Sequence, residues 1–462
     1  MGVQRNAIGR RGLLAATAAL VATALVAPAA SAAPAADSGS TAPTAPGVTA
    51  TDARQAAAVR ALERAAHPLR STEPGGRTTD LRALGAMIGD ARVVGLGEAT
   101  HGSHEFFAMK ERVFRYLVEE KGFTTFALEM SWTAGLRIDE YLQGGAGDAR
   151  RIAKQELAGS PWEREEFVSL ITWMRRYNDQ HPDRRVHFMG NDVGAPRLGD
   201  AAFDRVASHV RATHPQDLAR LEGLYAGLRP MDDVFAYLGR PVAERRHNAT
   251  VAQQALDLVV ANKGAGGDAY EWAEQHARNI AQTFAFASLD LSDPESVSEA
   301  EHLRDRAMAD NTAWWHRRTG DRMLLSAHNG HVGYLSSDPV MYPTTQGVFL
   351  RNALGRGYVA VGFTFDRGSF LTGTSLGGAW NKVTVPAATP DMQEYTLDRV
   401  RLRDYYVDLR TLPAVGRSWL DTPRPVYEAG SSFKNDPLPS LAVGRSHDIL
   451  VHLHEVHAAV AI

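Results

Sequence analysis

A glutamate and a histidine, Glu98 and His101, follow an apolar run that ends at Gly97. An imidazole exchanges protons near neutral pH, so such a pair can serve as a general base held in place by a carboxylate. Taken alone, the same spacing is also typical of a capping glutamate and a surface histidine in a turn. Open α/β sheets bind their ligands at the carboxyl ends of strands, and this position therefore favours a role in chemistry.

Three more apolar runs end in polar side chains of the same kinds. Glu129 closes the second run and Asp192 the third, while His328, Asn329 and His331 belong to a His-Asn-Gly-His sequence after the fourth. A single strand-end acid often caps the next helix, and two loop histidines could be zinc ligands, a substrate clamp or exposed residues. Together with Glu98 and His101, one shared cleft is the simplest interpretation, in which we expect Asp192 and Asn329 to contact the substrate.

An amphipathic helix is predicted from about Ser103 to Lys121, with Ser103 as its N-cap and Gly122 as its stop. Lys110 falls within the apolar stripe of this helix, where a cation is costly unless it meets a carboxylate or snorkels to water. Its side chain points back towards the loop of Glu98, so we expect Lys110 to contact the substrate. The stripe consists of Phe106, Met109, Val113, Phe114 and Leu117.

The elements that must position these groups alternate between short apolar runs and amphipathic stretches. This alternation predicts an α/β fold with a largely parallel central sheet flanked by helices. Between about residues 200 and 318 the strand signals stop, which predicts a helical insertion that covers the sheet and walls the cleft. The predicted strands are Arg92–Leu96, Thr124–Leu128, Val186–Met189, Arg322–Ser326, Tyr358–Phe365, Tyr405–Leu409 and Ile449–Leu453.

The composition narrows the function further. The 462 residues are 44% hydrophobic and 22% charged, enough for a large buried core, and the net charge of -3 gives no reason to bind nucleic acid. The chain has no cysteine, which excludes disulfides, thiol nucleophiles and Cys-ligated zinc. The chemistry must therefore rest on oxygen and imidazole groups.

The N-terminus is typical of an export signal. Arg10 and Arg11 precede an apolar run from Leu13 to Val26, and Ala30–Ala32 fits a cleavage site before Ala33. The run is shorter than the ~20 apolar residues that a membrane-spanning helix needs, so removal is favoured over anchoring. The paired arginines indicate the twin-arginine route, or chance in an Arg-rich chain. We expect a secreted protein without stable membrane association, divided into a signal at 1–32, a disordered linker at 33–50 and a domain at 51–462.

Several of these segments resemble the signature blocks of erythromycin esterases. The resemblance rests on Gly97–Gly102, on Glu129 at the end of the second strand, and on Ala327–Val332. The stretches Trp173–Asn178 and Arg306–Asn311 are also similar to that family. The likeness runs from about Leu81 to the C-terminus and is weaker in the insertion and the last hundred residues.

The resemblance implies an α/β core with a helical insertion and hydrolysis of an ester by water, typically of a macrolide lactone, without a metal or another cofactor. In that family His101 would be the general base, and Glu98 and Glu129 would orient the base or the water. His328 and His331 would line the cleft. The partner would be a small-molecule ester or lactone, and the role antibiotic resistance, detoxification or biosynthesis.

One departure and two alternatives stay open. The family has an arginine nine residues after the motif histidine, and Lys110 keeps that charge without the planar fork. A zinc-dependent hydrolase could use His101, His328, His331 and one glutamate, although no His-Glu-x-x-His pairing fixes two ligands on a helix. A non-catalytic exported protein that binds a ligand or processes envelope polymers could use the same cleft.

Overall fold

The computed structural model describes residues 50–462 except 265 and 374–378. The predicted export signal and the predicted linker up to residue 49 lie outside the described residues. The first helix, α1, spans Ala50–Ala65. No helix within the described ranges is both long and apolar enough to cross a membrane.

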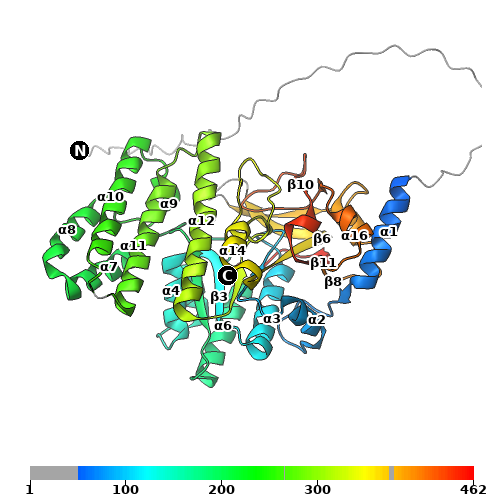
Figure 1. Cartoon of the computed structure of the whole chain (residues 1–462), viewed down its shortest axis with the longest axis horizontal. Helices are drawn as coiled ribbons and strands as arrows, with labels where there is room; N and C mark the ends of the chain where they lie inside the picture. The colour runs from blue at the N-terminus through cyan, green and yellow to red at the C-terminus, as the bar shows by residue number, and fades with distance from the viewer. Residues whose placement is uncertain (1–49, 265, 374–378) are drawn as a thin grey trace, which may run out of the picture. The chain divides into compact units, whose positions relative to one another are not determined.

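A nine-stranded sheet forms the centre of the fold (Figure 1). Its order is β1-β8-β11-β6-β2-β5-β3-β4, with β7 paired to β6. The six strands from β11 to β4 in this order run parallel, whereas β1, β7 and β8 pair antiparallel. The bounds are β1 His67–Pro68, β2 Val93–Leu96, β3 Thr125–Ser131, β4 His187–Asp192, β5 Met323–Ser326, β6 Tyr358–Gly373, β7 Trp380–Val385, β8 Tyr405–Asp408 and β11 Ile449–Val456.

The central strands are apolar on both sides because helices cover both faces of the sheet. In β2, Val94 packs into one hydrophobic core with helices α2 to α6, whereas Val93 packs into another with α4, α12 and α14. The predicted parallel sheet is therefore confirmed. The predicted strands correspond to β2 to β6, β8 and β11, and β6 extends beyond the predicted Phe365 to pair with β7.

Four strands escaped prediction for a physical reason. β1, β9 (Arg424–Pro425) and β10 (Ser440–Leu441) are two residues long, and β7 is largely exposed. None of them has the buried apolar run on which the sequence argument depends. The helices outside the insertion are α2 Arg82–Ile88, α3 His104–Lys121, α4 Trp132–Leu142, α5 Ala149–Glu156, α6 Glu165–Gln180, α13 Asn329–Val332, α14 Gln346–Leu354, α15 Gln393–Leu397, α16 Ala414–Leu420 and α17 Val443–Ser446.

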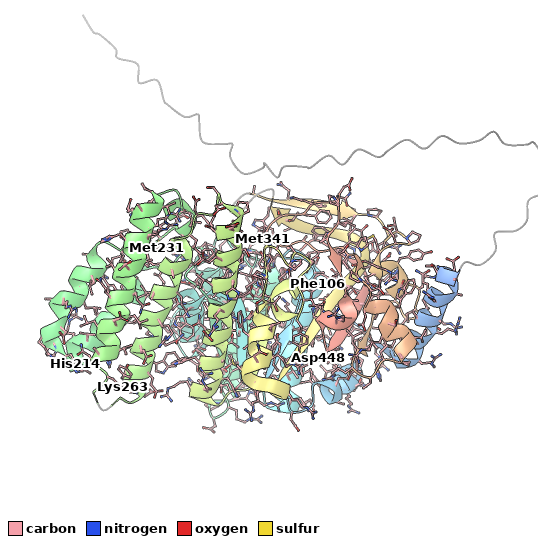
Figure 2. All side chains as sticks on the ribbon, turned by 45° about the horizontal axis from the view of Figure 1, so that its top comes forward. Phe106, His214, Met231, Lys263, Met341 and Asp448 are labelled. Carbon is pink, nitrogen blue, oxygen red and sulfur yellow. The ribbon has the colours of Figure 1, made fainter. Side chains whose placement is uncertain are left out.

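The described residues between β4 and β5 form helices and connecting loops but no strand, as predicted. Helices α7 to α11 enclose a hydrophobic core of their own, and α12 packs against both these helices and the sheet (Figure 1). Figure 2 draws the side chains on the ribbon and labels Met231 in the insertion and Phe106 beside the sheet. The bounds are α7 Asp200–Thr213, α8 Pro215–Ala226, α9 Val234–Tyr237, α10 Val242–Ala261, α11 Asp268–Ala287 and α12 Pro294–Thr319.

The helix that follows the Glu98 loop, α3, ends as its sequence predicts. Gly122 adopts a left-handed conformation at φ 68°, where a side chain would be strained, and stops the helix. Ser103 occupies the N-cap position without the expected side-chain cap bond. Its hydroxyl instead lies 2.5 Å from that of Thr100, which ties the loop to the start of the helix.

Candidate active site

The carboxyl ends of four neighbouring strands meet at one edge of the sheet, in the order β2, β5, β3 and β4. A cleft of about 530 Å³ opens at this edge. The side chains that the sequence placed at strand ends and that line this cleft are His101, Glu129, Asp192, His328 and His331. The topology therefore brings together residues that lie far apart in the chain.

Behind the cleft wall, Glu98 joins His101 to Lys110. One carboxylate oxygen of Glu98 lies 2.5 Å from Nδ1 of His101, and the other accepts a hydrogen bond from the ammonium of Lys110. Burial raises the pKa of Glu98, but Lys110 and His101 outweigh this effect and hold its pKa below the usual value. An ionised Glu98 accepts a hydrogen bond from Nδ1–H of His101, which leaves Nε2 free to accept a proton.

The same contacts show which groups bind the two glutamates and Lys110. The carboxylate that holds His101 is Glu98, while Glu129 is bound to other groups. Lys110 is fully buried and contacts Glu98, with the carbonyl of Ala327 at 3.5 Å. It does not line the cleft, so its position supports an ion-pair role better than the predicted contact with substrate.

Glu129 is the centre of a second charged network. One oxygen accepts from Arg304 at 2.8 Å and lies 3.2 Å from Nε2 of His331, and the other accepts the backbone N–H of His328 at 2.9 Å. Arg304 also donates to Asp192 at 2.6 Å. Burial alone would raise the pKa of Glu129, but His331 and Arg304 lower it well below the usual value.

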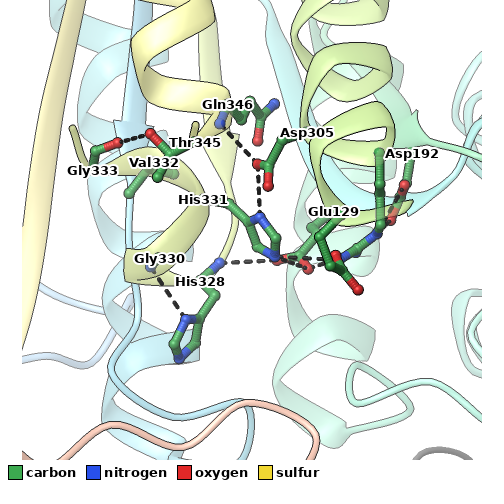
Figure 3. Close-up of polar contacts among 12 residues, drawn as sticks. Glu129, Asp192, Asp305, His328, Gly330, His331, Val332, Gly333, Thr345 and Gln346 are labelled. Atoms are coloured by element: carbon green, nitrogen blue, oxygen red, sulfur yellow. Dashed lines mark hydrogen bonds and ion pairs between the residues drawn. The ribbon is translucent and has the colours of Figure 1, made fainter. Parts of the chain in front are cut away.

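His331 lies between two carboxylates, as Figure 3 shows with Asp305 on one side and Glu129 on the other. Its Nδ1 is 2.8 Å from Asp305, whose same oxygen accepts the backbone N–H of Gln346 at 2.8 Å. Burial opposes a charged ring, yet the two carboxylates raise the pKa of His331 well above its ordinary value. His331 is therefore an imidazolium in the charged wall of the cleft.

His328 has the opposite character. Its Nδ1 accepts the backbone N–H of Gly330 at 3.2 Å, so the proton of a neutral ring must be on Nε2. Burial, followed by the neighbouring His101, lowers the pKa of His328 to about 3, which keeps the ring neutral. Nε2 has no hydrogen-bond partner within the described part of the chain, and the ring lies 4.9 Å from that of His101. It is an unused donor at the cleft.

Asn329 occupies a different place from the one predicted. Its side-chain amide donates to the carbonyl of Phe363 at 2.7 Å and accepts the N–H of the same residue at 3.0 Å. Both polar ends of the amide thus bind the backbone of β6, and Asn329 does not line the 530 Å³ cleft. This geometry favours anchoring of the histidine loop over contact with substrate.

Sequence reasoning missed several side chains of the site. Arg304 and Asp305 come from α12, and Glu428 comes from a loop after β9. Asp305 offered a signal, because it shares the buried face of α12 with Met308 and Thr312, where an unpaired charge is unfavourable. Other missed residues that line the cleft are Trp162, Glu301, Tyr342 and Trp380.

The donor geometry does not favour a zinc centre in the cleft. Both ring nitrogens of His331 are already bound by carboxylates, and Nδ1 of His328 accepts an N–H, so among the three histidines Nε2 of His101 and Nε2 of His328 remain, fewer than the three imidazoles of the zinc hypothesis. Within the described ranges, the side chains whose ligand atoms gather closely enough for a metal ion are Asp366, Asp398 and His454. They do not line the cleft.

Comparisons with known proteins place the chain in a family. It is 25% identical to erythromycin esterase type II of Escherichia coli over 339 residues, 64% of this chain and 74% of that one. A crystal structure of a Bacillus cereus protein has a TM-score of 0.81 at 28% identity and covers 88% of this chain and 99% of that chain. An erythromycin esterase mutant in its open conformation has a TM-score of 0.64 at 18% identity and covers 83% and 96%, a likeness of fold alone.

The model of the erythromycin esterase family matches residues 118–456. This range includes Glu129, Asp192, His328 and His331, whereas Glu98 and His101 precede it. The match covers well over half of the chain, and the protein therefore belongs to the erythromycin esterase family, which implies that it is a hydrolase.

Proposed function

We propose that this protein hydrolyses carboxylic esters or lactones with a water molecule that His101 activates, without a metal ion. The observation that carries the proposal is the 2.5 Å contact between Glu98 and Nδ1 of His101, which directs the free Nε2 to the cleft. Water is a poor nucleophile near neutral pH, so attack on an ester carbonyl needs a base that takes its proton.

The groups around His101 suit each stage of that reaction. Nε2 accepts a proton from water as the hydroxide attacks the carbonyl carbon, and the ionised Glu98 stabilises the imidazolium that forms. Lys110 keeps Glu98 ionised by offsetting the cost of its burial. The Nε2–H of His328 is a preorganised donor for the oxyanion of the tetrahedral intermediate.

The cleft supports a large small-molecule substrate. Its 530 Å³ lies within the range of ligand pockets and combines apolar walls, such as Phe286 and Trp380, with the charged groups described above. A macrolide lactone is a substrate of suitable size, as the name of the Escherichia coli relative suggests, and resistance would follow from its hydrolysis. We propose further that the protein is exported by the twin-arginine route and acts outside the cytoplasm.

The test is a hydrolysis screen by mass spectrometry over macrolides, simple lactones and simple esters. We expect wild-type protein dialysed against a chelator to retain its activity, and His101→Gln to lose ~10²- to 10⁴-fold in kcat/KM. His214→Gln is a matched control, because His214 belongs to the insertion (Figure 2) and does not line the cleft. Equal turnover by His101→Gln and His214→Gln would show that the base lies elsewhere, and zinc-dependent recovery of activity would favour the metallohydrolase.

A further inference from the structure

A loop from the C-terminal part of the chain completes the wall of the cleft beside His101. The N–H of Ala429 donates to the carbonyl of Ala99 at 2.8 Å, and the N–H of His101 donates to the carbonyl of Ala429 at 3.1 Å. This backbone pairing fixes the residue before Ala429, which is Glu428, against the same cleft. Glu428 has no role in the reaction proposed for His101 and Glu98.

The carboxyl group of Glu428 is largely buried, and no arginine or lysine forms an ion pair with it among the described residues. Its Oε1 lies 3.7 Å from Nδ1 of the neutral His328, and its Oε2 has no hydrogen-bond partner among the described residues. Burial raises the pKa of Glu428, and the Ser337 side chain and the nearby His331 offset only part of this rise. A raised pKa favours the protonated carboxyl group, whose O–H is a hydrogen-bond donor at the cleft.

Glu428 also lines a second, small cavity of about 10 Å³, together with Glu394 and His447. This space is about that of one water molecule. Oε2 of Glu394 and both ring nitrogens of His447 lack hydrogen-bond partners in the described structure, so three unsatisfied groups surround it. Burial raises the pKa of Glu394 to about 8 and lowers the pKa of His447 to about 4. Both side chains are therefore uncharged near neutral pH.

We propose that Glu428 is the general acid that protonates the leaving alkoxide, an inference that rests on the proposed ester hydrolysis. When the tetrahedral intermediate collapses, the bond between the carbonyl carbon and the alkyl oxygen breaks, and the O–H of Glu428 gives its proton to that oxygen. The products are an alcohol and a carboxylic acid. Glu428 is left as a carboxylate and regains its proton from the imidazolium of His101 through water, so the two proton transfers balance.

Loss of a general acid should slow the hydrolysis of two kinds of ester to different extents. A 4-nitrophenolate leaves readily without a proton, whereas an aliphatic alkoxide is a strong base and needs one as the bond breaks. The test uses a 4-nitrophenyl ester and an ethyl ester of the same acid. We expect Glu428→Gln to lower the ratio of ethyl-ester to nitrophenyl-ester kcat/KM by ~10²-fold or more. Glu428→Asp, which keeps the acid, should recover part of that ratio, and His101→Gln should lower both rates together.

The pH profile provides a second readout. The groups that face Glu428 are His101, His328 and His331 from the cleft and Glu394 and His447 from the small cavity. The wild-type rate on the ethyl ester should fall on the alkaline side as Glu428 ionises, and this limb should disappear in Glu428→Gln. Thermal melts on each preparation show that the variants are folded.

The outcomes are distinct. An unchanged ratio in folded Glu428→Gln, or an equal loss on both esters, would overturn the assignment and leave the proposed hydrolysis intact. If the folded Glu428→Asp variant loses as much of the ratio as Glu428→Gln, the acidic proton does not account for the effect and the assignment also fails. Turnover of neither ester, and of no lactone or macrolide, by wild-type protein would overturn the proposed function itself.

Discussion

Arg304 on α12 donates to Glu129 on β3 over 2.8 Å, although 175 residues separate the two in the chain. Arg304 also binds Asp192 at the end of β4. Glu129 and Asp192 are buried, whereas the Arg304 side chain is 17% exposed. The predicted insertion is therefore more than a wall, because its last helix supplies the cation that neutralises two acids of the cleft. The carboxylates in turn raise the pKa of Arg304 well above its usual value, against the effect of burial.

Replacing Arg304 by methionine should destabilise the protein. The change leaves Glu129 and Asp192 buried without their shared cation, and breaking a buried ion pair from one side typically costs ~3–5 kcal/mol. Chemical denaturation monitored by tryptophan fluorescence measures this loss. Arg306→Met is the matched control, because the Arg306 side chain is 61% exposed and its ion pair lies at the surface. Equal stability of the two variants would contradict a structural role for the buried network.

The Lys110 position allows a double-mutant test. Lys110→Met leaves Glu98 buried with only His101 beside it, so we expect a loss of ~3–5 kcal/mol in the free energy of unfolding. The double variant Glu98→Gln/Lys110→Met removes both charges and should recover most of that stability without recovering hydrolysis. Unfolding curves and kcat/KM on the same preparations check both outcomes. A double variant as unstable as Lys110→Met alone would mean that the pair is not the source of the loss.

The strand-end groups could be predicted because a local rule fixes their place. Parallel strands deliver their carboxyl ends to one edge, so an apolar run followed by Glu98, Asp192 or His328 already implies a common site. Lys110 was detectable as a cation within an apolar stripe, and its contact with Glu98 follows from the direction of side chains on a helix. The order of strands and the division of labour between Glu98 and Glu129 depend on long-range packing and required the structure.

The residues missed from the sequence have no such rule. Arg304 lies in the middle of a polar helix, and Glu428 lies in a loop without periodicity, so only tertiary contacts place them at the cleft. Asn329 illustrates the converse. Its position between two site histidines suggested substrate contact, but backbone groups of β6 needed hydrogen-bond partners and took both ends of its amide.

His104, the first residue of α3, should make stability depend on pH. Its ring lies 2.7 Å from Glu166 and 3.0 Å from Glu73, and these carboxylates, mainly Glu166, raise its pKa to about 9 from 6.5. A raised pKa contributes stability that is fully present below pH 6.5 and lost as the pH rises through about 9. The difference in Tm between wild type and His104→Gln should therefore shrink across this window. A constant difference would contradict the shift.

The apolar part of the insertion should influence which esters enter. Phe235 of α9 and Val297 of α12 line the cleft. Their side chains are apolar, so they form no hydrogen bond or ion pair with His101 or with the charged groups around it. We expect Phe235→Ala and Val297→Ala to change KM for a large lactone more than for ethyl acetate, with kcat on the small ester nearly unchanged. Val260→Ala, at an exposed site on α10, serves as the control. Equal losses on both substrates would refute selection by this wall.

The export prediction has a direct measurement. The protein recovered from the medium or the extracytoplasmic fraction of its native host should begin close to Ala33, as shown by intact mass. Changing Arg10 and Arg11 to lysine should reduce export if the twin-arginine route is used. Full-length protein that starts at Met1 and remains in the cytoplasm would contradict the prediction.

Backbone hydrogen bonds join the loop that carries His101 to residues more than 300 positions later in the chain. Ala429 pairs with Ala99 and His101, and the N–H of His104 donates to the carbonyl of His457 at 2.8 Å. During translation this loop leaves the ribosome long before its partners exist, and contacts between such distant segments form late in folding. A chain synthesised only up to this loop carries the imidazole without the backbone contacts that place it in the cleft, so we expect the site to assemble only after Ala429 and His457 have been made.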